Sequence, residues 1–457
     1  MTRELLYLIL IFGLLVVPRV LQRWKLPAPL TCLLFGLLAM LAFGDRVHDP
    51  VLVLLSTLGI SSLFLFAGLE VDPRELRKGA GPLIVHLVIR CATLAGAAWL
   101  AWRYLDLNWQ AATLLALAVL TPSTGFILDT LERLGLDEAE RFWVTSKAIA
   151  GELLALAALF VVLQAGDTSA MAINTGVLLA MLVGLPLLFI ALGRWVVPHA
   201  PGSEFSLLVM VGMVAAYITY SMGVYYLVGA FIAGLVARLL RVRMPRLASD
   251  DNIHALRLFA SFFVPFYFFH AGTGIPREAL SWEAVLLGVV LTMVVLPLRI
   301  GVVWLQRRVM FREAHAGTLK VSVALAPTLV FTLVLAGILY QRFDLPPVMY
   351  GALLLYTAIN TLLPSLLLKA PFDVDPADEA LALARGEALA DALGEGEGEG
   401  EGGSALPGTP PAAGARVQVA IADGAAGERS GGQIADGQIA AGEGHGDPAG
   451  APLRHPS

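Results

Sequence analysis

Long runs of apolar residues follow one another from the start of the chain to about residue 370, and polar residues collect between them. Most runs hold about 17 to 25 residues, the length that an α-helix needs to cross a hydrocarbon core roughly 30 Å thick. Only helices and closed barrels satisfy their main-chain groups in lipid. The pattern therefore predicts an all-α membrane protein of about thirteen transmembrane helices, at 5–22, 26–43, 50–69, 80–103, 109–131, 142–165, 172–197, 205–221, 223–240, 255–272, 281–305, 316–340 and 346–369.

The overall composition supports this interpretation. Hydrophobic residues make up 57% of the chain and charged residues only 15%, a balance that soluble domains of this length do not show. Both cysteines, Cys32 and Cys91, fall inside predicted spans, so we expect neither a disulfide framework nor a Cys/His metal site. The sequence shows no phosphate-binding loop and no nucleophile with a histidine partner, which argues against an enzyme. We expect no cofactor and no nucleic-acid partner.

Basic residues are spread unevenly over the loops. If thirteen spans are correct, eighteen Lys and Arg lie in loops after odd-numbered spans, and five lie on the other side with the N-terminus. Cytoplasmic loops carry the excess of positive charge in membrane proteins. We therefore predict a multi-pass protein of the cell inner membrane or plasma membrane, with the N-terminus outside and the C-terminus in the cytoplasm.

The composition changes abruptly near Pro371. From there to Ser457 the chain is rich in Gly, Ala and Pro, and it carries fifteen acidic residues against four arginines. Such a segment cannot bury enough apolar surface to fold. We expect a transmembrane domain over residues 1–370 and a disordered, acidic cytoplasmic tail over residues 371–457.

The span at 109–131 is interrupted by Thr-Pro-Ser-Thr-Gly at 121–125. A proline among small hydroxyl residues breaks a membrane helix and frees main-chain groups at mid-depth. The next span carries an acid near its centre, where a carboxylate is costly, is favoured in its neutral form and marks a functional site by default. We interpret the two features together as the ion- and proton-binding site of a transporter, with these candidates: Glu152, Gly151, Thr121, Ser123 and Thr124.

The chain also repeats itself at a distance of about 205 residues. Ala-Gly at 67–68 followed by Pro-Arg-Glu at 73–75 recurs at 271–272 and 276–278, and Pro122 with its hydroxyl neighbours recurs as Pro327-Thr328. Thirty residues separate Pro122 from Glu152, and thirty separate Pro327 from Thr357. The two copies are seven spans apart, and because this number is odd, the second copy would be inverted in the membrane. Inverted repeats with matching helix breaks, here at Pro122 and Pro327, are typical of secondary transporters.

Two basic residues lie within reach of this site. Arg299 interrupts an apolar run, and we weigh it as a counter-charge to the site against a side chain that extends to the cytoplasmic surface. Lys147 precedes Glu152 by five residues and does not share its helical face. We weigh Lys147 as a second counter-charge against a structural pairing with Asp129. A carboxylate at 152 that is only paired with Lys147 or Arg299 would be structural.

Other polar residues inside spans are less specific. His86 and Arg90 lie four residues apart on one helical face, which favours a buried structural pair over a proton path. Thr328, Thr357 and Asn360 offer oxygen atoms as ligands, but such side chains also cap broken helices. Small residues at 229–234 permit close helix packing.

With these features the sequence resembles the monovalent cation/proton antiporters, in particular the bacterial potassium or sodium/proton exchangers, over roughly residues 5–370. The resemblance implies two crossed discontinuous helices, a homodimer, and a core that moves against a dimerising scaffold. It rests on four stretches: Leu-Phe-Ala-Gly-Leu-Glu-Val-Asp at 65–72, the broken span at 121–135, Gly-Ala-Phe-Ile-Ala-Gly-Leu at 229–235, and Ala-Pro at 326–327 with the apolar run that follows.

The sequence departs from that family at one position. Members usually carry Asp-Asp or Asn-Asp where this chain has Gly151 and Glu152. The resemblance assigns the ion-binding carboxylate to Glu152, leaves Gly151 without a side chain, and places the basic residue of the later helix at Arg299. A single carboxylate suggests electroneutral exchange of one monovalent cation for one proton.

Two alternatives remain open at this stage. A sodium-coupled solute symporter also uses crossed broken helices, and would take up an organic solute with little proton movement. A transporter-like sensor of pH or ions would have lost transport and would signal through its acidic tail. We expect the antiporter, with lipid, a monovalent cation (Na⁺ or K⁺) and H⁺ as its partners.

Overall fold

The computed structural model describes residues 3–44, 49–131, 134–166, 168–200, 202–244, 249–311 and 315–368. The predicted acidic tail lies outside these residues. The described part is helical and has no strand. Its helices are α1 (Arg3–Leu21), α2 (Ala28–Phe43), α3 (Pro50–Leu69), α4 (Pro73–Lys78), α5 (Ala80–Tyr104), α6 (Trp109–Leu120), α7 (Thr124–Leu131), α8 (Glu138–Gln164), α9 (Thr168–Trp195), α10 (Glu204–Ser221), α11 (Tyr226–Leu239), α12 (Asp250–Thr273), α13 (Trp282–Phe311), α14 (His315–Ala324), α15 (Leu329–Arg342) and α16 (Pro347–Leu367).

The predicted number of spans is confirmed. Eleven segments of the described chain are long and apolar enough to cross a membrane, and α2 and α11 are shorter apolar helices that complete the set of thirteen. Two of the eleven segments are discontinuous. One is formed by α6 and α7, and the other by α14 and α15.

Side-chain caps fix the first residues of two of the helices, and one of these helices starts earlier than predicted. The sixth span starts at Glu138 rather than at 142, because Asp137 and Glu140 form a reciprocal capping box at its first turn. The third span starts as predicted, at Pro50, where the Asp49 carboxylate accepts a hydrogen bond from the main-chain N–H of Val51. Apolar length alone does not reveal such polar first turns.

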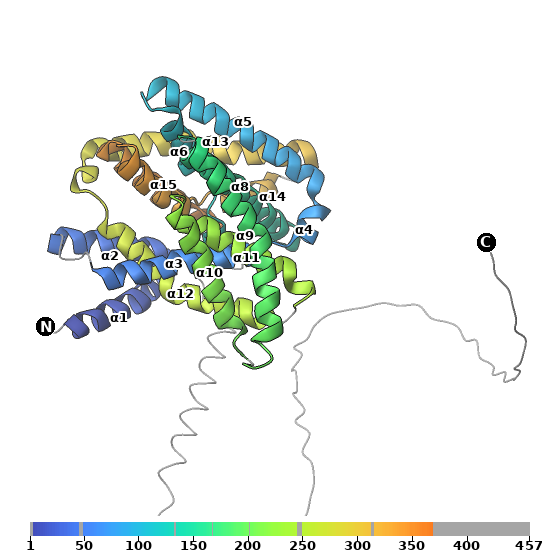
Figure 1. Cartoon of the computed structure of the whole chain (residues 1–457). Helices are drawn as coiled ribbons and strands as arrows, with labels where there is room; N and C mark the ends of the chain where they lie inside the picture. The colour runs from blue at the N-terminus through green and yellow to red at the C-terminus, as the bar shows by residue number, and fades with distance from the viewer. Residues whose placement is uncertain are drawn as a thin grey trace, which may run out of the picture. The chain divides into compact units, whose positions relative to one another are not determined.

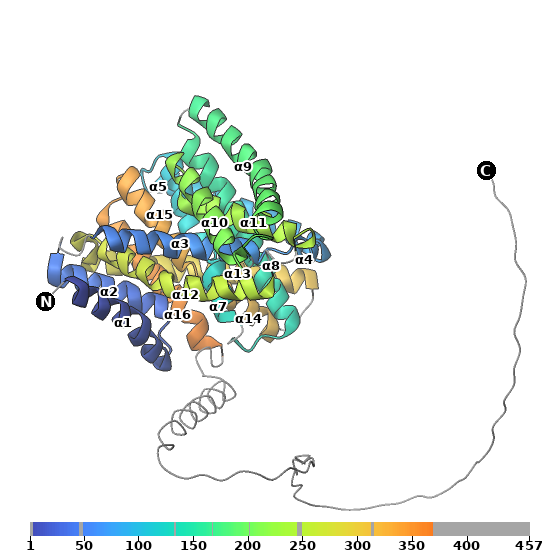
Figure 2. The ribbon, with the colours of Figure 1, turned by 60° about the horizontal axis from the view of Figure 1, so that its bottom comes forward.

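The helices form two groups by their contacts. We call the first group the panel, which consists of α1, α2, α3, α10, α11 and α12. Within it α3 and α12 pack along each other, with α2 against α12 and α11 against α3 (Figures 1 and 2). We call the second group the bundle, which consists of α5 to α8 and α13 to α16. Both broken helices belong to the bundle.

Glycines bring the panel helices into close contact at two matching places. A side chain on Gly36 in α2 would begin 1.9 Å from the Phe269 carbonyl oxygen of α12. A side chain on Gly234 in α11 would begin 2.1 Å from the Leu65 carbonyl oxygen of α3. No real Cβ approaches an oxygen so closely, so these positions require glycine. The close packing expected for the small residues at 229–234 is therefore present.

Candidate functional site

The two helix breaks touch each other inside the bundle. The first, at residues 121–123, separates α6 from α7, and the second, at 325–328, separates α14 from α15. The main-chain N–H of Ser123 donates to the carbonyl oxygen of Pro327 at 2.9 Å. Pro122 and Pro327 cannot continue the helical hydrogen-bond pattern because they lack an N–H. The predicted pair of crossed breaks is present.

Side chains from distant helices satisfy the last carbonyl groups of α6. The Thr332 hydroxyl donates to Ala118 O at 2.8 Å, and the Tyr356 hydroxyl donates to Val119 O at 2.6 Å. The Arg90 guanidinium, from α5, donates to Leu120 O. A helix end buried in the membrane interior needs such partners, because no water reaches it.

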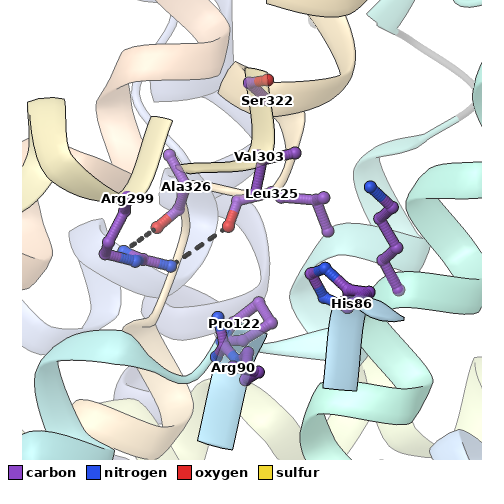
Figure 3. Close-up of a pocket in the computed structure, with 9 residues that line it drawn as sticks. His86, Arg90, Pro122, Arg299, Val303, Ser322, Leu325 and Ala326 are labelled. Carbon is purple, nitrogen blue, oxygen red and sulfur yellow. Dashed lines mark hydrogen bonds between the residues drawn. The ribbon is translucent and has the colours of Figure 1, made fainter. Parts of the chain in front are cut away.

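The end of α14 is satisfied in a corresponding way. Arg299, from α13, donates to Ala326 O at 2.7 Å and to Leu325 O at 3.1 Å (Figure 3). It also donates to the Tyr356 hydroxyl at 3.0 Å. Each arginine comes from the helix that directly precedes its broken helix. Each binds the carbonyl group two residues before the proline, at Leu120 and at Leu325.

Neutral polar side chains fill the second break. The Thr328 main-chain N–H donates to Asn360 Oδ1 at 3.2 Å, and Asn360 Nδ2 donates back to the Thr328 hydroxyl at 2.9 Å. The Thr328 hydroxyl also lies within hydrogen-bond distance of two further hydroxyl groups, at 2.7 Å from that of Thr332 and 3.3 Å from that of Thr357. Thr328, Thr332, Thr357 and Asn360 all have 0% exposure. This break forms a closed network of uncharged groups.

An acid and unpaired oxygen atoms lie at the first break instead. Glu152 in α8 is 1% exposed, and within the described part of the chain its Oε2 has no hydrogen-bond partner. Thr124, the first residue of α7, presents its hydroxyl and main chain to that carboxyl group, and its Oγ1 also lacks a hydrogen-bond partner. The N-terminal end of a helix carries partial positive charge. The arrangement offers oxygen ligands to a small cation and a carboxyl group that can hold a proton.

The other candidates of the first break lie around this pair. Thr121 and Ser123 are buried within the break. A Cβ on Gly151 would stand 3.5 Å from Arg90 Nε and 3.6 Å from the Pro122 ring, at ordinary contact distance. Position 151 therefore faces the break and Arg90. Ligand roles for these three residues remain predictions.

The two predicted counter-charges make other hydrogen bonds. Lys147 Nζ donates to Gln306 Oε1 at 3.0 Å, and His86 Nδ1 shares that oxygen at 2.9 Å. Arg299 binds the α14 carbonyl groups and Tyr356, as described above. A role of either residue opposite Glu152 remains a prediction. The side chain of Asp129, the expected partner of Lys147, lies outside the described residues.

Sequence reasoning missed the part that Arg90 and Tyr356 play. His86 and Arg90 do not bond to each other as expected, because Gln306 takes the first and Leu120 O takes the second. Tyr356 bridges the two breaks. Tyr356 follows Pro327 at the same distance at which Gly151 follows Pro122. Comparing the neighbours of Glu152 and Thr357 in the repeat, and not only these two residues, would have indicated Tyr356.

Comparisons with known proteins agree with this architecture. The profile of the family described as sodium/hydrogen exchanger, transmembrane, matches residues 8–373. No curated protein matches the chain. Two solved structures of a sodium proton antiporter, MjNhaP1 from Methanocaldococcus jannaschii, have similar folds. The first, determined at pH 8, superposes with a TM-score of 0.57 at 14% identity, covering 80% of this chain and 97% of that one. The second, from an electron-microscopy map, superposes with a TM-score of 0.55 at 15% identity, covering 80% of this chain and 96% of that one.

Proposed function

Because the chain belongs to the sodium/hydrogen exchanger family, we propose that it is a secondary antiporter that exchanges a monovalent cation, Na⁺ or K⁺, for H⁺. Glu152 is the residue at which the two ions compete. The similar solved structures support the fold and not the choice of ion, since their identity to this chain is low.

One observation carries the proposal: the Glu152 carboxyl group is buried beside the first break, with an unsatisfied oxygen next to the unsatisfied hydroxyl of Thr124. An ionised carboxylate with one unpartnered oxygen is strongly disfavoured in so dry a site. It becomes stable when it binds a proton or a cation. The Glu152 carboxylate without a bound ion is charged and crosses the membrane interior poorly. Each crossing of the site therefore carries either a proton or a cation.

The same reasoning sets the stoichiometry that we propose. One carboxyl group alternates between one proton and one monovalent cation, so the exchange is electroneutral. Among the described residues no group of three or more His, Cys, Asp and Glu side chains is positioned to hold a metal ion. Oxygen ligands from the break, with a single negative charge, suit a monovalent cation better than a divalent one.

Alternating access follows from the two groups of helices. The panel is held together by glycine contacts that leave little room for internal movement. We propose that the bundle moves against it and carries the crossed breaks from one side of the membrane to the other. We further propose a homodimer in the cell membrane, with the N-terminus outside and the C-terminus in the cytoplasm.

The test is Glu152→Gln in everted membrane vesicles, with cation-dependent proton flux as the readout. The control is Glu138→Gln, which removes an exposed acid from the first turn of the same helix. We expect the first variant to lose exchange and the second to keep it. Wild-type flux in Glu152→Gln would contradict the proposal. A panel of Li⁺, Na⁺ and K⁺ identifies the cation, and solute uptake without proton movement would indicate a symporter.

A further inference from the structure

A small cavity beside the site is lined by basic side chains. It lies where α5, α8, α13 and α14 meet the first break (Figure 3). Its polar lining consists of His86, Arg90, Lys147, Arg299 and Ser322. Glu152 is not among the lining residues, and no Asp or Glu is. The space suits about one guest of the size of a water molecule.

Two of these side chains are permanent cations with neutral partners. Arg90 and Arg299 bond only to carbonyl and hydroxyl oxygens, and neither forms an ion pair within the described structure. The two guanidinium groups repel each other, and Arg90 and Lys147 add positive potential at His86. Lys147 has contacts beyond its bond to Gln306, so the charge without an acidic partner is that of the two arginines.

The helix ends offset only part of this charge. Each arginine faces the C-terminal end of a half-helix, and such an end carries about half a negative charge. Two arginines against two helix ends leave an excess of about one positive charge. Excess charge of this kind is costly away from water unless a counter-ion neutralises it.

Arg299 and the backbone at Gly151 leave room for a further ligand near the two arginines. Arg299 lines the cavity and is 8% exposed, and its Nε has no hydrogen-bond partner among the described residues. Gly151 places no side chain against Arg90 Nε, although a Cβ would fit there at 3.5 Å. A side chain at residue 151 would therefore lie against Arg90, and glycine provides none.

We propose that the cavity binds one small monatomic anion, with chloride as the natural occupant, between the Arg90 and Arg299 guanidinium groups. Its size excludes phosphate and organic anions. The anion would neutralise the excess charge and hold the ends of α6 and α14 in place. This site is separate from Glu152 and does not depend on whether the protein exchanges cations.

Halide binding to the purified full-length protein tests this proposal. Thermal unfolding is followed by tryptophan fluorescence at fixed sodium concentration while gluconate is replaced by chloride or bromide. We expect a rise in the unfolding midpoint that saturates with halide concentration. Arg90→Gln should weaken the halide affinity about tenfold or more, because it removes one charge-assisted contact. Arg241→Gln, which removes an exposed arginine paired with Asp250, should keep the wild-type affinity.

Gly151→Asp is the decisive variant, because it supplies a tethered carboxylate in place of the anion. We expect this variant to be insensitive to halide and to have, without halide, a higher unfolding midpoint than its neutral isostere Gly151→Asn. The variant also keeps the proposal testable if Arg90→Gln does not fold. Halide binding that persists in Glu152→Gln would show that the site is independent of the cation site.

Two results would overturn the proposal. The first is an unfolding midpoint that stays the same when gluconate is replaced by chloride or bromide, which would mean that the cavity holds only water. The second is a saturable halide effect that is unchanged in both Arg90→Gln and Gly151→Asp. Bromide-specific anomalous scattering between the two guanidinium groups, in crystals of the full-length protein, would confirm the position of the anion.

Discussion

The two helix breaks have the same arrangement of proline and arginine but differ in the other side chains that surround them. In each, a proline interrupts a helix and an arginine from the preceding helix binds the carbonyl group two residues earlier. At the second break, Asn360 and Thr357 complete a neutral network around Thr328. At the first, the residue in register with Thr357 is Glu152, and its Oε2 has no partner. We therefore infer that the second break is structural and propose that an ion is gained and lost at the first.

The largest expected effect comes from making the first break resemble the second. Glu152→Thr replaces the acid by the side chain found at the matching position, 357. We expect cation-dependent proton flux in vesicles to fall to background. We also expect the unfolding midpoint to stay equal or to rise, because a buried unpaired acid is removed.

The reverse substitution, at position 357, serves as the control for Glu152→Thr. Thr357→Glu places a second acid in a fully occupied network, so we expect low yield of folded protein rather than a new transport site. Flux that survives in Glu152→Thr, or a well-folded and active Thr357→Glu, would mean that the difference between the breaks does not determine transport.

The next largest effect concerns the arginine of the second break. Arg299→Met leaves Leu325 O and Ala326 O without their donor. Two unsatisfied buried carbonyl groups should cost about 2–5 kcal/mol of folding free energy. Thermal unfolding in detergent measures the loss. Arg19→Met, which removes an exposed arginine in the last turn of α1, serves as the control. Equal stability of the two variants would show that the Arg299 bonds contribute little.

A smaller effect is expected for the hydroxyl groups that link the breaks. Thr332→Val removes the donor to Ala118 O and the hydroxyl contact with Thr328, at nearly constant volume. We expect a loss of about 1–3 kcal/mol, because a buried carbonyl group loses a partner. The matched control is Thr175→Val in α9, whose hydroxyl bonds only to its own helix at Met171 O. If both variants lose the same stability, the contact between the breaks is not a special feature.

The smallest effect is expected from removing the C-terminal segment. The contacts of both breaks come from helices that end at Leu367, so deletion of residues 371–457 should leave proton flux and cation preference unchanged. Flux assays on the shortened chain measure this. Loss of flux in a well-folded shortened protein would favour the alternative in which the protein acts as a sensor.

Much of the fold was predictable, because the signals for it are local. Apolar length and loop charge identified the spans, and Pro122 and Pro327 marked the breaks, since a proline disrupts a helix wherever it lies. The polar first turn of α8 was missed for the same reason, because its cap at Asp137 lies before the apolar run.

The site was only partly predictable, because its bonds join residues far apart in sequence. Glu152 and Thr124 stood out as polar groups at mid-span. The bond from Tyr356 to Val119 O and that from Thr332 to Ala118 O connect the two halves of the chain. Such contacts depend on how the helices cross. Arg299 could be recognised as a deep charge, but its choice of main-chain carbonyl groups over a carboxylate could not.

Proton release on cation binding tests the central claim most directly. The purified full-length protein, in weak buffer near neutral pH with a pH-sensitive dye, is titrated with Na⁺ and then with K⁺. We predict that each bound cation displaces about one proton in the wild-type protein, and that Glu152→Gln displaces none. Cation binding without proton release in the wild type, or undiminished release in Glu152→Gln, would contradict competition at this carboxyl group.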